Sequence, residues 1–145
     1  MLKRTLEEFV VGETAVFSRT FTEIDVAQFV GITWDVNPYH TDEAFCKAHR
    51  LARRIVPGML VGSLLTHIGG IAAILASEIS FDFLAPVFVG ETITATCTVE
   101  EVDTRRGWAR VEMVCTNPDQ KIVAQGTVRG FPARFKDRLR HGEEK

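Results

Sequence analysis

The chain has 145 residues, of which 46% are hydrophobic, which is the size of one domain with a substantial core. Its 17 Lys and Arg residues against 19 Asp and Glu residues give a formal net charge of -2, which excludes a general attraction to nucleic acid. The three cysteines, which have no Cys-x-x-Cys spacing, argue against a disulfide framework or a zinc site and favour a reducing cytoplasm. We expect one cytoplasmic domain over residues 1–134, followed by a charged tail over residues 135–145.

The first predicted elements are a strand and a short helix. Apolar and polar residues alternate between Ala15 and Phe21, as they do in a half-buried strand. Thr22 then precedes the acidic Asp25 by three residues, a spacing typical of a helix N-terminus. We expect this helix to end at Gly31, which can adopt the left-handed conformation of a C-terminal cap.

The next segment, WDVNPYH at residues 34–40, combines an acid, an amide and an imidazole around a proline. Pro38 fixes its own φ and pushes Asn37 toward extended geometry, so Asp35 and His40 can be held in one fixed relation. A carboxylate and an imidazole on either side of one water form a general acid/base pair, which can add water to an activated double bond or remove it. The alternative is a polar turn in which Asp35 and Asn37 only cap the local backbone.

Two further helices are predicted before the chain changes to strands. The first covers residues 43–50, and the second begins at Pro57, whose missing N–H suits the first helical turn. Apolar residues cover most of the second helix up to Ile68, so it must be wrapped on several sides. Residues 55–77 carry no Asp, Glu, Lys or Arg, but the prolines, glycines and polar residues among them argue against a membrane span.

Four strands are predicted in the second half of the chain, with turn sequences that favour antiparallel hairpins. One strand, three helices and four strands indicate an α+β domain in which an antiparallel sheet wraps around a central buried helix. The expected strands are Ala73–Phe83, Thr92–Val102, Trp108–Thr116 and Ile122–Phe131.

Three motifs, in this order, resemble those of the MaoC-like (R)-specific enoyl-CoA hydratases. They are D-x-N-P-x-H at residues 35–40, IVPGML at residues 55–60 and F-x-x-x-x-P-V-x-V-G-E at residues 81–91. The resemblance runs from about Thr5 to about Pro132 and implies the hotdog fold. It also implies a homodimer in which the sheets of two such units join and the active sites lie at the interface.

The same resemblance implies the reversible hydration of a trans-2-enoyl thioester of coenzyme A or acyl carrier protein, in fatty-acid metabolism and without a cofactor. It assigns the catalytic water to Asp35 and His40, and the polarisation of the thioester carbonyl to the backbone N–H of Gly58. A helix N-terminus is suited to that task, since its N–H groups are unpaired and carry a positive partial charge. Gly58 could equally serve only to let the helix start close to a neighbouring backbone.

Four more residues are candidates for binding substrate. Thr66 matches a small hydroxyl residue of the family and could bond Asp35 or the ligand, although it could also bond back to its own helix. Asn37 and Met59 lie within the motifs, and Trp34 could line an acyl pocket or belong to the core.

The sequence departs from the family pattern at two places. Pro57 stands where the family commonly has histidine, which leaves the role of a backbone N–H intact. The connection after Gly70 is shorter than usual, and from it we expect a preference for short or unusually shaped acyl groups.

Two other functions remain open on the sequence alone. A hotdog acyl-CoA thioesterase would attack the thioester carbonyl instead of the double bond, and a non-catalytic acyl-thioester-binding subunit would keep the fold without turnover. Three arginines and the charged tail could attract the phosphates of coenzyme A or be merely solvated. The arginines are Arg50, Arg53 and Arg54.

Overall fold

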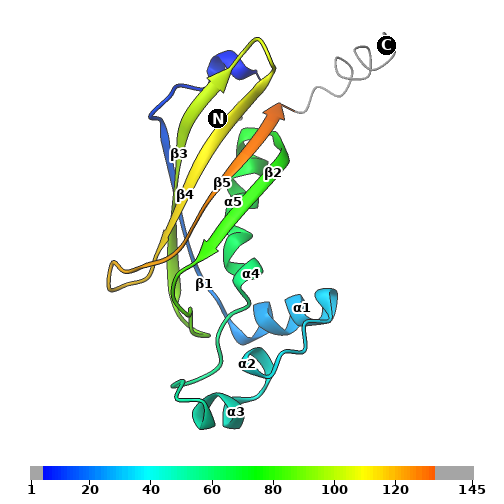
Figure 1. The fold of residues 1–145 in the computed structure, drawn as a ribbon, viewed down its shortest axis with the longest axis vertical. Coiled ribbons are helices and arrows are strands. Elements are labelled where there is room, and N and C mark those ends of the chain that lie inside the picture. The colour runs from blue at the N-terminus through cyan, green and yellow to red at the C-terminus, as the bar shows by residue number, and fades with distance from the viewer. Residues whose placement is uncertain (1–4, 133–145) are drawn as a thin grey trace.

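A computed structural model describes residues 5–132 of the chain. The elements follow the predicted order of one strand, a helical region and four strands (Figure 1). They are η1 (Leu6–Glu8), β1 (Thr14–Thr20), α1 (Glu23–Thr33), α2 (Pro38–Thr41), α3 (Glu43–Ala48), α4 (Gly58–Gly62), α5 (Leu64–Ala72), β2 (Ile74–Phe83), β3 (Thr92–Asp103), β4 (Trp108–Thr116) and β5 (Ile122–Pro132). The expected charged tail lies outside the described residues.

The five strands form one antiparallel sheet with the order β1-β3-β4-β5-β2. The two predicted hairpins, β3–β4 and β4–β5, are confirmed. β1 and β2 therefore form the two edges of the sheet.

The core lies between one face of this sheet and the helical pair α4–α5, which runs along it (Figure 1). Alternate residues of β3 and β4 are buried, as expected for strands with one covered face. From the helical side, Val61, Leu64 and Leu65 are buried against them. Another flank of α5, with Thr66 and His67, is exposed in the single chain. The predicted arrangement of sheet and central helix is thus confirmed, with one flank of the helix left open.

α1 begins as predicted but ends later. Thr22 and Asp25 bond reciprocally, with 3.2 Å from Asp25 N–H to the Thr22 hydroxyl and 2.8 Å from Thr22 N–H to the carboxylate. The hydrogen bond from the Thr22 backbone holds the pKa of Asp25 below its usual value. The expectation that Gly31 ends the helix is wrong, because the helix continues to Thr33 and Trp34 takes the left-handed conformation.

The other helices also differ in detail from the prediction. Residues 38–41 form a single helical turn, α2, where only a turn was expected. The long third helix is divided at Ser63, whose hydroxyl donates to the carbonyl of Leu60 at 2.6 Å. In the described part of the chain, no helix has the length and apolar character needed to cross a membrane.

The three cysteines are free and buried, which leads to a test of the packing. Burial raises the pKa of Cys97 to about 11 and that of Cys115 to about 12. Because the thiolate is the reactive form, we expect both to resist thiol reagents at pH 8 in the folded protein and to react once guanidinium unfolds it. Mass spectrometry after timed alkylation measures this, and rapid labelling of either residue under native conditions would contradict the packing.

Candidate active site

The turn between α1 and α2 is held by its own side chains. The Asp35 carboxylate accepts from the N–H of Asn37 at 3.3 Å, and the Asn37 amide oxygen accepts from the N–H of Tyr39 at 3.2 Å. Pro38 occupies the first position of α2, where its missing N–H costs no helical hydrogen bond. The local capping that was the alternative interpretation of this motif is therefore present, and it fixes the backbone that carries Asp35.

His40 lies at the end of the same turn, with Asp35 beside it. Nε2 of His40 is 3.7 Å from Oδ2 of Asp35, which is too long for a direct hydrogen bond. The imidazole is buried, with 8% of the residue exposed, while 43% of the Asp35 side chain is exposed. The pair thus has one buried member and one that solvent reaches.

The other ring nitrogen of His40 determines what Nε2 can do. Nδ1 is 2.9 Å from the carbonyl oxygen of Ile55, which can only accept, so Nδ1 carries a proton. In the neutral ring, Nε2 is then an acceptor. Nε2 of His40 and the carboxylate of Asp35 therefore both present acceptors toward the same small space.

Ile55 also joins this turn to the segment that leads into α4. Its N–H donates to the carbonyl of Tyr39 at 3.0 Å, so Ile55 binds the turn through both of its backbone groups. Gly58 follows three residues later as the first residue of α4. These bonds hold the turn that carries Asp35 and His40 and the start of α4 in one unit.

The segment at residues 81–91, the third sequence motif, is hydrogen-bonded to the segment that leads into α4. Val56 N–H donates to the carbonyl of Val87 at 2.7 Å, and Val89 N–H donates to the carbonyl of Arg54 at 3.1 Å. Glu91 accepts from the N–H of Phe88 at 2.7 Å and so closes the turn after this short pairing. The motif at residues 81–91 thus positions the chain immediately before Gly58.

Gly58 combines a helix start with close packing. The first N–H groups of a helix have no partner inside it, so that of Gly58 is available for a ligand. A Cβ at this position would lie 3.2 Å from the ring of Phe83, which packs on the glycine. Both sequence interpretations of Gly58 are therefore compatible with its surroundings.

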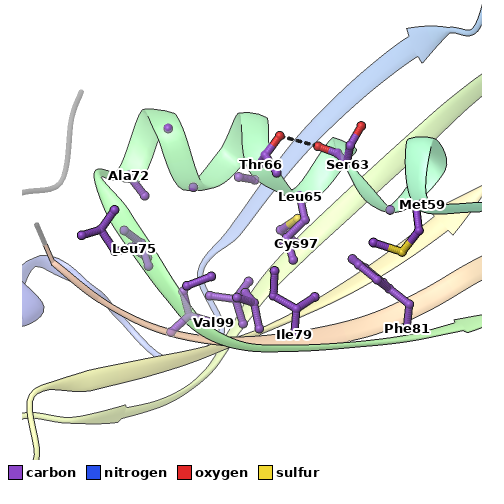
Figure 2. A pocket seen from close by; sticks show the side chains of 18 of the residues that line it. Met59, Ser63, Leu65, Thr66, Ala72, Leu75, Ile79, Phe81, Cys97 and Val99 are labelled. Carbon is purple, nitrogen blue, oxygen red and sulfur yellow. Dashed lines mark hydrogen bonds between the residues drawn. The ribbon is translucent and has the colours of Figure 1, made fainter. Parts of the chain in front are cut away.

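An apolar cavity of about 740 Å³ extends from this region between α5 and the sheet (Figure 2). Its lining includes Thr33, two residues before Asp35, and Met59, the neighbour of Gly58. Asp35 and His40 themselves are not among the lining residues. The cavity therefore lies beside the turn that carries Asp35 and His40 and does not enclose that turn.

The remaining sequence candidates have different surroundings. Met59 lines the cavity and is exposed at 60%. Thr66 lines it too, but its hydroxyl donates to the carbonyl of Ser63 at 2.6 Å, so it bonds back to its own helix (Figure 2). Trp34 is 84% exposed and lines neither this cavity nor the smaller pocket beside Phe17 and His67.

Several residues that position the site were not predicted from the sequence. Ile55 holds the turn through its backbone N–H and carbonyl groups, and the pattern of side chains in a sequence gives no information about such backbone contacts. Cys46 is fully buried, and its thiol lies 3.3 Å from the carbonyl of Tyr39, next to His40. Phe83, whose ring packs on Gly58, is not one of the residues that define the third motif, although it lies two positions after the motif residue Phe81. Only the spacing of Phe81 and Phe83 on one strand could have indicated that both face the helix.

The charged and aromatic neighbours have structural partners. His49 stacks on Phe45 with ring centroids 4.0 Å apart, and His67 stacks on Phe17 at the same distance. Arg54 pairs with the carboxylate of Glu23. Within residues 5–132, no three His, Cys, Asp or Glu side chains gather as a metal ion would require.

Comparisons with known proteins agree on one family. A family model described as MaoC like domain matches residues 8–122. The (R)-specific enoyl-CoA hydratase of Rhodospirillum rubrum is 29% identical over 133 residues, which cover 88% of this chain and 92% of that protein. The mitochondrial 3-hydroxyacyl-acyl-carrier-protein dehydratase FERN of Solanum lycopersicum is 32% identical over 125 residues, covering 80% of this chain and 73% of that protein.

A solved structure gives the same result. The (R)-hydratase from A. caviae involved in PHA biosynthesis superposes with a TM-score of 0.82 and 28% sequence identity. The match covers 87% of this chain and 98% of that one.

Proposed function

This chain belongs to the MaoC-like domain family and has its hotdog fold, and from that premise we propose that it reversibly hydrates trans-2-enoyl thioesters to (R)-3-hydroxyacyl thioesters. The substrates are thioesters of coenzyme A or of acyl carrier protein, as the names of the two relatives suggest. The reaction is that of a carbon–oxygen lyase in fatty-acid metabolism.

One observation carries the proposal. His40 Nε2 and Asp35 Oδ2 are both acceptors and lie 3.7 Å apart. A single water can satisfy both by donating one hydrogen to each, and its oxygen lone pairs then point away from them. A water held in this way is oriented as a nucleophile.

The chemical steps follow from that arrangement. The water oxygen forms a bond to C3 of the enoyl group while the Asp35–His40 pair takes one of its protons. The electron pair of the double bond moves toward C2 and the thioester oxygen, where the backbone N–H of Gly58 stabilises the negative charge. The proton then passes to C2 and completes the addition. The thioester itself activates the double bond, so no metal or redox cofactor takes part.

The four remaining candidates contribute to binding in this proposal. Met59 contacts the acyl group where the cavity begins. Thr66 and Asn37 offer polar groups near the thioester, although the hydroxyl and the amide oxygen are each already bonded to the backbone. Trp34, being exposed, contacts the parts of the substrate that stay outside the cavity.

A thioesterase and a non-catalytic binding subunit are the competing functions, and one experiment separates all three. Purified protein is incubated with crotonyl-coenzyme A while enone absorbance and free thiol are followed in parallel. Hydration removes the enone without releasing thiol. Thiol release would indicate the thioesterase, and binding without either change would indicate the non-catalytic subunit.

We further propose that the protein is a cytoplasmic homodimer joined along β2. The edge strand and the helix flank beside it expose large apolar side chains at 49% to 60%, namely Ile79, Phe83, Leu84 and Met59. The other edge strand, β1, exposes one large apolar side chain, Val16 at 64%, beside the small or polar Thr14, Ala15, Ser18, Arg19 and Thr20. Ile32, Trp34 and Val36, around the Asp35 turn, are also exposed, which supports contact of this turn with the second subunit.

Sedimentation at micromolar concentration should give a species of twice 16.2 kDa. A charge in the middle of the proposed interface, Ile79→Glu, should shift the equilibrium toward the monomer, because a carboxylate is costly to bury without a partner. Val16→Glu, on the opposite edge strand, is the matched control and should stay dimeric. A wild-type monomer, or dissociation caused by Val16→Glu alone, would contradict the arrangement.

A further inference from the structure

The geometry of the Asp35–His40 pair depends on where the backbone places Asp35. The ring of His40 is buried and its Nδ1 is held by the carbonyl of Ile55 at 2.9 Å, so the position of Nε2 is fixed. The Asp35 side chain is 43% exposed, and its carboxylate accepts from the N–H of Asn37 at 3.3 Å, within the same turn. The 3.7 Å between Nε2 and Oδ2 therefore changes whenever the backbone at Asp35 moves.

The residue immediately before Asp35 has an uncommon backbone conformation. Trp34 ends α1 with φ 60° and ψ 24°, in the left-handed region. This region is costly for a residue with a side chain, because the Cβ then lies close to the following carbonyl oxygen. A right-handed Trp34 would continue α1 and carry Asp35 along the helix, away from α2. The left-handed turn thus brings Asp35 to His40, and surrounding contacts must offset its cost.

Thr33 forms a hydrogen-bonded bridge across this turn. Its hydroxyl donates to the carbonyl of Phe29 at 2.7 Å, inside α1, and the same oxygen accepts from the N–H of Asp35 at 3.3 Å. Trp34 therefore lies between the two residues that the bridge connects. In a continued helix the N–H of Asp35 would bond to the carbonyl of Gly31, four residues back. The bond to Thr33 thus favours the turn over the helix.

Resting on the hydratase function proposed above, we propose that Thr33 is a positioning residue for the reaction. Its hydroxyl holds Trp34 in the left-handed conformation and keeps the carboxylate of Asp35 at the distance from His40 that one water can bridge. Thr33 itself takes no part in the proton transfer. Because Thr33 also lines the cavity beside α5, a contact with the acyl group is the alternative role.

The first test is Thr33→Val, which keeps the branched shape and removes the hydroxyl. One hydrogen bond contributes about fivefold to an equilibrium, so we expect kcat for crotonyl-coenzyme A to fall about fivefold and KM to stay within about twofold. Thr33→Ser keeps the hydroxyl and should restore kcat to within about twofold of wild type. Thr41→Val is the matched control and should leave kcat within about twofold, since the Thr41 hydroxyl also bonds four residues back, to the carbonyl of Asn37 at 3.2 Å.

A second variant tests the link between the hydroxyl and the left-handed residue. Glycine adopts this conformation at no steric cost, so the turn in Trp34→Gly should no longer need the bridge. Adding Thr33→Val to Trp34→Gly should therefore change kcat by less than about twofold, against about fivefold when Trp34 is present. An equal loss in both backgrounds would show that the hydroxyl does not act through Trp34, and would overturn the proposal.

Amide hydrogen exchange at Asp35, measured by NMR, tests the bridge without reference to turnover and should be faster in folded Thr33→Val than in wild type. Unchanged exchange would overturn the proposal. A rise in KM with unchanged kcat would assign Thr33 to the acyl group instead, and failure of Thr33→Ser to restore kcat, or a matching loss in Thr41→Val, would also contradict the positioning role. If wild-type protein leaves the enone intact, the hydratase function itself fails, and exchange at Asp35 still decides whether Thr33 holds the turn.

Discussion

Replacing Asp35 with asparagine, or His40 with alanine, should lower the rate of hydration at least about a hundredfold, because general acid/base groups contribute about 10²–10⁴. Asp35→Asn is the sharper of the two changes. Its amide oxygen can still accept from the N–H of Asn37, so the turn keeps its hydrogen bond and loses only the charge. The loss should fall on kcat, since the pair acts on the water more than on substrate binding.

His49→Ala provides the matched control for His40→Ala. His49 is an exposed histidine nine residues further on, bonded to the carbonyl of Phe45 at 2.8 Å, and its loss should leave kcat within about twofold of wild type. Circular dichroism and the melting temperature establish that each variant is folded. Near-normal turnover by folded Asp35→Asn would show that the turn has only its local capping role.

Gly126→Ala should be the most destabilising single methyl addition in the sheet. The new Cβ would lie 2.3 Å from the carbonyl oxygen of Ser80 and 2.4 Å from the ring of Phe81. Ser80 belongs to the paired strand β2, so its backbone cannot yield without opening the β2–β5 ladder. Overpacking of this kind costs about 3 kcal/mol, which for a chain of this size lowers the melting temperature by about 10 °C.

The control for this change is Gly31→Ala. Gly31 lies inside α1, a Cβ there meets nothing within 4 Å, and alanine is the better helix former by up to about 1 kcal/mol. Its melting temperature should stay level or rise. Thermal unfolding of the two variants side by side measures the difference, and equal melting temperatures would mean that the β2–β5 pairing is looser than described.

The strands and the turn that carries Asp35 and His40 could be predicted from sequence because their signals are local. Alternation located β1, β3, β4 and β5 within about a residue of their observed bounds, and the proline in the D-x-N-P-x-H motif indicated a fixed turn. Asp35 and His40 lie close together because they are only five positions apart in the chain. Local rules therefore predicted that these two side chains of the candidate site are neighbours.

Most features that these local rules did not predict depend on contacts between segments that are distant in the sequence. The tautomer of His40 is set by Ile55, whose backbone enters only through tertiary structure. The cavity beside α5 is likewise set by the distance between this helix and the sheet, which local patterns in the sequence do not report. The end of α1 is an exception because it is decided locally: Gly31 carries the usual signal of a helix end, yet the helical hydrogen bonds continue to the one from Trp34 N–H to the carbonyl of Val30 at 2.8 Å.

If Asp35 and His40 deliver water to one face of an enoyl thioester, the hydrated product has a single configuration. Chiral chromatography of the product formed from crotonyl-coenzyme A, with enone absorbance followed in parallel, determines that configuration. We expect loss of the enone and formation of the (R)-3-hydroxybutyryl thioester, with both lost together in Asp35→Asn. Formation of the (S) product, or an enone that persists in the presence of folded wild-type protein, would contradict this expectation.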